Sequence, residues 1–182
     1  MRTTNLLTRL LLLAFCAAVA ATMAHAADPA PPRTIEWQDL MPKGWDPMKD
    51  FKGIDLGQLD DSDPRANELL MKMQEIANNA PTNAQMNGVV VKLAGYVVPL
   101  EESKGEITEF LLVPSFGACI HTPPPPANQV VHVRPRQAAK LRTMDTVWIT
   151  GKLQAVRGDS MMGVSGYRMT ADSVARYTGA AK

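Results

Sequence analysis

Two hydrophobic periods divide the chain into a helical part and a strand-rich part. Between residues 64 and 80, apolar side chains recur every three or four positions, which is the spacing of one face of a helix. Asp63 and Pro64 form a start signal, because Asp is a favoured N-cap and Pro suits the first helical turn. The pattern therefore predicts one amphipathic helix over 64–80, with its Leu and Met side chains in contact with the core.

From residue 88 onward the hydrophobic period shortens to two, which is typical of β-strands. Strands are predicted over residues 89–98, 107–113, 130–133, 146–156 and 167–171, with a final short element over 172–177. We expect a helical turn over 137–141 and a simple turn over 158–163. This order predicts a mainly β fold with one or two helices. Its centre is a five-stranded, partly open OB-like barrel over 88–177, preceded by an N-terminal helix and an extended arm.

Single residues predict where these strands are interrupted. Pro99 is expected to end the first strand, because proline has no N–H to give to a ladder. A short hairpin loop over 101–106 should then join the first strand to the second. Gly151, inside the fourth strand, predicts a bend or a bulge.

The first 26 residues have the pattern of a secretory signal peptide. Residues 10–21 are almost purely apolar, but this run is shorter than the roughly 20 residues that span a bilayer. It is followed by Ala24-His25-Ala26, an A-x-A cleavage sequence, whereas bulky Phe15 before Cys16 argues against a lipoprotein. We expect cleavage after Ala26, a periplasmic location and no stable membrane insertion afterwards, because no later apolar run has spanning length.

Residues 27–63 have the composition of a proline-rich linker followed by an acidic arm that contains Trp37 and Trp45. Residues 27–88 carry eleven acidic and six basic side chains, whereas 89–182 carry seven acidic and eleven basic ones. These opposite charges predict that the arm packs on the barrel; the alternative is a free peptide that docks on a partner. The whole chain has a net charge of +1 and few strand aromatics, which argues against nucleic-acid binding.

The loop between the second and third strands carries the candidate chemistry, Cys119 and His121. Two positions apart in an extended chain, their side chains point the same way. A glycine that permits a tight turn precedes them, and a stiff polyproline rod follows. The predicted scaffold of this loop is Gly117, Pro123, Pro124, Pro125, Pro126 and Asn128.

Four interpretations of this pair stay open. Cys119 is a small buried hydrophobe, as free cysteines often are, and His121 bonds a carbonyl. Alternatively, the two residues begin a copper or zinc site that His132 or methionines complete. A thiol enzyme is the third, because the segment resembles the S-x-G-C-[IV]-R loop of L,D-transpeptidases, although Ala118 is inserted and His121 replaces Arg. The fourth is a proline-rich recognition surface for a partner protein.

Long blocks of this chain resemble an exported bacterial family known as domain of unknown function 3299. The matching segments are residues 37–42, 95–101, 109–129 and 147–152, and one departure is Ser115, where tyrosine is expected. The family has no assigned activity, and its members are encoded beside ABC-transporter components and metal-responsive genes. The resemblance implies a non-enzymatic accessory or binding protein of the envelope, linked to metal handling or to an ABC transporter. The alternative is a cysteine-dependent envelope enzyme that uses Cys119, although a nearby base and acid to activate its thiol are missing.

Overall fold

The computed structural model describes residues 31–52, 64–117 and 125–178. The elements named below belong to the unit that begins at Pro32 and ends at Lys182. The signal-peptide prediction for residues 1–26 lies outside the described residues, and so do Cys119, His121, Pro123 and Pro124. Within the described ranges, no helix combines the length and the apolar character that crossing a bilayer requires.

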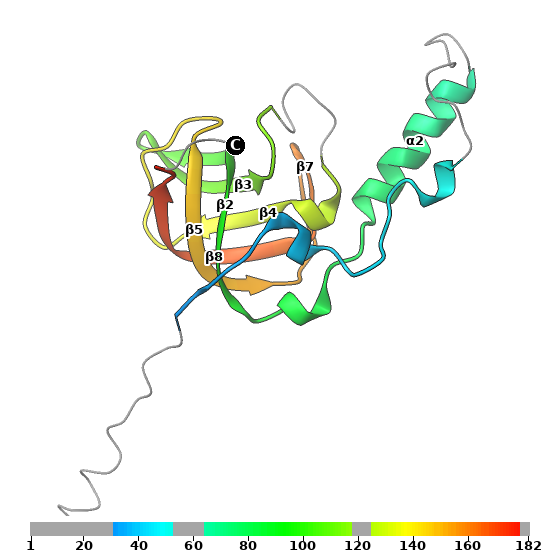
Figure 1. The fold of residues 1–182 in the computed structure, drawn as a ribbon. Coiled ribbons are helices and arrows are strands. Elements are labelled where there is room, and N and C mark those ends of the chain that lie inside the picture. Colours follow the sequence, from blue (N-terminus) through cyan, green and yellow to red (C-terminus); the bar gives the residue numbers. More distant parts are fainter. Residues whose placement is uncertain (1–30, 53–63, 118–124, 179–182) are drawn as a thin grey trace, which may run out of the picture. The chain divides into compact units, whose positions relative to one another are not determined.

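Five strands curl into a barrel (Figure 1). They are β2 (Val90–Ser103), β3 (Glu106–Val113), β4 (Val131–Pro135), β5 (Thr146–Gln154) and β8 (Tyr167–Arg176). The neighbour order is β2-β3-β4-β8-β5, and β5 pairs again with β2 to close the ring. Among the pairs of these five strands, β4–β8 is parallel, and the others are antiparallel. The predicted mainly β fold with a five-stranded barrel is confirmed.

Strand β2 is longer than the sequence predicts, because Pro99 does not end it. Pro99 pairs with Phe110, and register shifts between Pro99 and Glu102 absorb the missing N–H. The strand then runs to Ser103, and Lys104 and Gly105 form the turn to β3 with φ of 53° and 78°. Two consecutive positive φ values are typical of the turns that match strand twist in short hairpins. The predicted bulge at Gly151 is confirmed by a register shift between Thr150 and Gly151.

Two connections between the later strands differ from the prediction. The helical turn expected over 137–141 is wrong: Ala139 N–H donates to Ile107 O at 3.1 Å and Ile107 N–H donates back at 2.9 Å. These bonds tie the segment to β3 instead of closing a helical turn. The turn expected over 158–163 is a hairpin of β6 (Gly158–Ser160) and β7 (Gly163–Ser165). Residues 172–176, expected as a separate element, continue β8.

The predicted helix is present as α2 (Pro64–Asn78), but its predicted contact with the core is wrong. None of the described side chains from Arg65 to Asn78 is buried. Leu70 is 60% exposed and Met71 is 72% exposed. In the barrel core, the N-terminal arm instead contributes Ile35 and Leu40.

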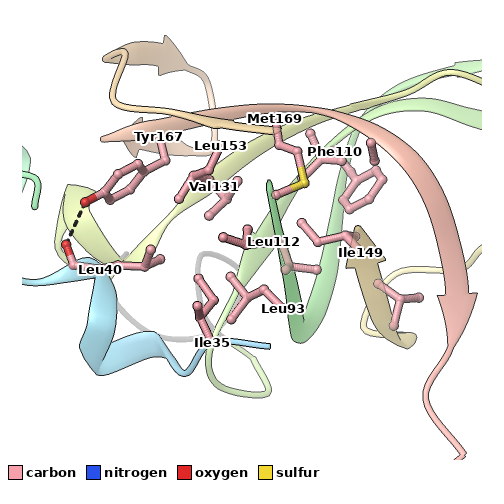
Figure 2. Packing of buried hydrophobic residues seen from close by; sticks show 14 of the residues in the cluster. Ile35, Leu40, Leu93, Phe110, Leu112, Val131, Ile149, Leu153, Tyr167 and Met169 are labelled. Atoms are coloured by element: carbon pink, nitrogen blue, oxygen red, sulfur yellow. Dashed lines mark hydrogen bonds between the residues drawn. The ribbon is translucent and has the colours of Figure 1, made fainter. Parts of the chain in front are cut away.

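The arm enters the barrel core, which confirms that it docks. It comprises β1 (Arg33–Thr34), which pairs parallel with β2, and the 3-10 helices η1 (Trp37–Leu40) and η2 (Lys49–Phe51). Figure 2 shows Ile35 and Leu40 among core side chains of the barrel. The Tyr167 hydroxyl donates to Leu40 O at 2.7 Å and accepts from Asn83 N–H at 2.6 Å. Trp37 and Trp45 are half-buried, so the free-peptide alternative is wrong for residues 33–41.

Candidate functional site

The C-terminal side of the proline loop is fastened to three other parts of the domain. Asn128, in η5 (Ala127–Gln129), is fully buried and donates from Nδ2 to Pro81 O at 2.9 Å. Gln129 Nε2 donates to Trp37 O at 2.8 Å. Ala127 O accepts from Gly166 N–H at 2.6 Å. These bonds join the loop's end to the arm, to the segment after α2 and to the start of β8.

The N-terminal side of the loop is described as far as Gly117, which contacts a methionine of another segment that has unusual backbone geometry. Gly117 is buried with φ of 79°, and its N–H donates to Met144 Sδ at 3.2 Å. Met144 itself has φ of 66°, in the left-handed region that costs a non-glycine residue about 1–3 kcal/mol. Of the predicted scaffold, the structure describes Gly117, Pro125, Pro126 and Asn128. The proposed pair, Cys119 and His121, lies outside the described residues.

A carboxylate, an imidazole and a guanidinium meet on the outer face of β3 and β4. Phe110 enters the core, so Glu109 beside it faces outward. The Glu109 carboxylate accepts from Arg134 Nε at 3.0 Å and Nη2 at 3.2 Å, a bidentate pair, and also contacts His132 Nε2. Glu109 is only 8% exposed. His132, weighed above as a metal ligand, therefore uses Nε2 for this carboxylate.

Arg134 and His132 lower the pKa of the Glu109 carboxyl group. Burial alone would raise the pKa of Glu109, but hydrogen bonds from Arg134 and His132, together with their charges, hold that pKa below its ordinary value. The other ring nitrogen of His132 faces the β6–β7 hairpin, since a Cβ on Gly158 would lie 3.4 Å from Nδ1. A carboxylate–imidazole pair can serve as a general base. Here the imidazole lies between Glu109 and the hairpin, so the cluster joins β3, β4 and β6.

Replacing Glu109 by glutamine is expected to lower the free energy of unfolding at neutral pH by about 1–3 kcal/mol, because charge-assisted hydrogen bonds are lost. The native pKa lies below the ordinary value of 4.5. The stabilisation is therefore present above that value and is lost as pH falls through the native pKa. Urea unfolding at about pH 7 and about pH 3 should show the gap between wild type and Glu109→Gln shrinking on acidification.

The matched control for this experiment is Glu68→Gln, which alters an exposed carboxylate on α2. It should change stability by less than about 0.5 kcal/mol at either pH. A gap between wild type and Glu109→Gln that is the same size at both pH values would contradict an ionised Glu109 in the native cluster.

An open hollow of about 290 Å³ lies along one side of α2. We call it the α2 hollow; its lining includes Pro47, Met48, Leu70, Met73, Ala77 and Pro126. The lining is mostly apolar and combines the helix, the arm and the end of the proline loop. Met71 is also exposed on this helix, although it does not line the hollow. The α2 hollow and Met71 together form what we call the α2 surface.

Sequence reasoning missed both the Glu109 cluster and the exposure of α2. One acid within the apolar strand Ile107–Val113 was a signal for the cluster, with His132 and Arg134 two positions apart on the next strand. The metal ligands predicted from the sequence, Cys119 and His121, lie outside the described residues. Among the residues that the structure describes, no group of three or more His, Cys, Asp or Glu side chains is arranged to bind a metal ion.

The fold defines a small OB-like barrel domain completed by an N-terminal arm. The family model described as "Protein of unknown function (DUF3299)" matches residues 37–176, so the chain belongs to the DUF3299 family. A crystal structure of a DUF3299 family protein from Pseudomonas aeruginosa PAO1 is 34% identical to this chain. The match covers 84% of this chain and 100% of the solved one, with a TM-score of 0.65.

One further solved structure resembles this chain only weakly. A Leishmania major Friedlin protein named as an aspartyl-tRNA synthetase is 7% identical, with a TM-score of 0.38. That match covers 85% of this chain and 22% of the other, and it supports no argument about this protein. No curated protein matches the chain.

Proposed function

We propose that this protein is an exported, non-enzymatic binding protein of the cell envelope that docks on a partner protein through the α2 surface. The observation that carries the proposal is the exposure of Leu70 and Met71, at 60% and 72%. Burying one such side chain is worth about 1.5–3 kcal/mol. Scattered exposed apolar side chains are ordinary, but an exposed apolar side chain that lines an apolar hollow, as Leu70 does, is typical of an interaction site.

The composition of the α2 surface fits a protein partner. Met48, Met71 and Met73 are flexible, polarisable side chains that adapt to another apolar surface. Pro47 and Pro126 border the α2 hollow with side chains that lose little entropy on binding. The resemblance to the family implies that the partner is a component of an envelope ABC transporter. The proposed export rests on the signal-peptide pattern of residues 1–26.

The double variant Leu70→Gln/Met71→Glu tests the proposal without disturbing the fold, because Gln and Glu are good helix formers and both positions are exposed. In envelope extracts, wild type should elute in an assembly larger than the isolated chain, and the variant should elute alone. The control Glu68→Gln/Lys72→Gln alters polar positions of the same helix and should keep the assembly. Co-elution of both variants with the large assembly would contradict the proposal.

A second candidate function, metal binding, is favoured by the sulfur of Met144. Its thioether contacts Gly117, which precedes Cys119 by two residues in the sequence. We propose that Cys119 and His121 bind Cu(I) together with methionine sulfur, because soft ligands select Cu(I). Zn(II) should compete only if nitrogen and oxygen ligands complete the site.

Anaerobic titration of the reduced protein with Cu(I) and Zn(II), against a competing chelator, tests this candidate. Cys119→Ser and His121→Ala should each weaken binding, and affinity should rise with pH because the ligands must lose protons. Wild-type-like binding by Cys119→Ser would exclude a thiolate site. The alternative of a thiol enzyme requires a reactive thiolate, so an alkylation profile of Cys119 with an ordinary pKa of about 8.5 would argue against it.

A further inference from the structure

A second hollow, which shares no lining residue with the α2 hollow, lies between the arm and the barrel. It has a volume of about 390 Å³ and is lined mainly by Ile35, Glu36, Trp37, Gln38, Ala94 and Trp148; we call it the aromatic hollow. Trp148 on β5 pairs in register with Ala94 on β2. The Trp37 indole Nε1 donates to Ala94 O at 2.8 Å. Two indoles therefore border a hollow in which Ala94 contributes only a methyl group.

Both indole rings are held in place by the folded chain. Trp37 is fixed by its hydrogen bond and by Gly95, where a Cβ would lie 2.8 Å from Trp37 Cζ2. The Lys92 ammonium lies 4.7 Å from the centroid of the Trp148 ring, and the Tyr177 ring lies 5.4 Å away at 33°. Rigid aromatic groups lose little entropy when a ligand binds, so the aromatic hollow is preorganised.

Polar groups of both kinds surround the rings. Glu36 and Gln38 are exposed, and Gln38 Nε2 donates to Glu36 Oε2 at 2.7 Å, which places a planar amide beside a planar carboxylate. One charge of each sign lies at the hollow, the Glu36 carboxylate in its lining and the Lys92 ammonium over the Trp148 ring. A balanced charge gives no attraction for a phosphate backbone, whose binding requires an excess of cations. The site therefore favours a neutral ligand with an apolar face and a hydrogen-bonding edge.

A sugar ring has this combination of surfaces. Its C–H groups form an apolar face that stacks on an indole, and its hydroxyls lie at the edge of the ring, where amide and carboxylate groups bind them. We propose that the aromatic hollow binds a neutral pyranose unit of a glycan. An alkyl chain would use only the apolar part of the hollow, and a nucleotide would bring charge that the hollow does not neutralise.

Calorimetric and tryptophan-fluorescence titrations with two neutral probes, chitotetraose and maltotetraose, test this site on the full mature chain. At least one probe should bind and quench the fluorescence. Ala94→Leu should fill the hollow and Trp148→Ala should remove one aromatic wall of it, and each should weaken binding by about tenfold or more. Trp45→Phe is the control, because Trp45 is half-buried and lies outside the lining; it should bind as wild type does.

Two results would overturn the proposal. One is the absence of binding for both sugars up to about 10 mM, which is weaker than any useful specific affinity. The other is binding of decaproline, weakened by Ala94→Leu, without binding of either sugar, which would make the hollow a polyproline groove. Circular dichroism and thermal unfolding of Ala94→Leu and Trp148→Ala show whether each variant is folded. Unchanged sugar binding by both folded variants would place the site elsewhere.

Discussion

Truncating Leu40 to alanine is expected to lower the free energy of unfolding by about 2–5 kcal/mol. Leu40 belongs to the arm, yet it is 0% exposed and packs in the barrel core with Leu93 and Leu112. Its carbonyl oxygen also accepts a hydrogen bond from the buried Tyr167 hydroxyl (Figure 2). Urea unfolding followed by circular dichroism measures the loss. Deleting residues 27–60 removes Ile35 as well and should cost still more.

The control for Leu40→Ala is Gln38→Ala, two positions away in the same 3-10 helix, where the side chain is exposed. It should change stability by less than about 0.5 kcal/mol. If Leu40→Ala and Gln38→Ala unfold at the same urea concentration, the arm is not part of the core and the docked arrangement is contradicted.

Gly95→Ala is expected to cost about 1–3 kcal/mol or more, because the added methyl has no room. Its Cβ would lie 2.7 Å from Val113 O and 2.8 Å from both Leu112 Cγ and Trp37 Cζ2. The Val113 carbonyl belongs to the β2–β3 ladder and cannot move without weakening that ladder. The Trp37 indole is nearly as close to the added methyl and must also shift. Thermal unfolding should show a lower midpoint, together with a changed tryptophan emission.

Gly105→Ala separates this clash from backbone strain. Gly105 has φ of 78°, but a Cβ there meets nothing within 4 Å. Its expected cost is only the strain of a left-handed residue, about 1–2 kcal/mol, with no change in tryptophan emission. Equal emission spectra for wild type and Gly95→Ala would show that Trp37 does not lie against Gly95.

The barrel strands could be predicted because alternation along a half-buried strand is a local signal. The barrel architecture followed from the order of strands and helices along the chain. The docking of the arm followed from opposite charges and from two tryptophans, Trp37 and Trp45, that need burial. The fate of Pro99 could not be read in this way. Whether a proline ends a strand depends on its partner strand, and here Pro99 pairs with Phe110 and the register shifts follow it.

The α2 surface shows why the site was harder to predict than the fold. A Leu and Met stripe at helical spacing is the same pattern whether the helix packs on a core or meets a partner. In the structure, Ile35 and Leu40 of the arm belong to the core, and the side chains of α2 do not. The Glu109 cluster depended likewise on the β3–β4 register, which sets Glu109 near Arg134 and His132.

Site-specific photo-crosslinking in the envelope tests the proposed function most directly. A photoreactive amino acid is placed at position 70 or 71 of α2, and as controls at position 72 of α2 and position 104 in the β2–β3 turn. The docking proposal predicts one crosslinked product from positions 70 and 71, absent from 72 and 104, that contains a component of an envelope transporter. A product formed equally from all four positions, or only with a second copy of this chain, would contradict it.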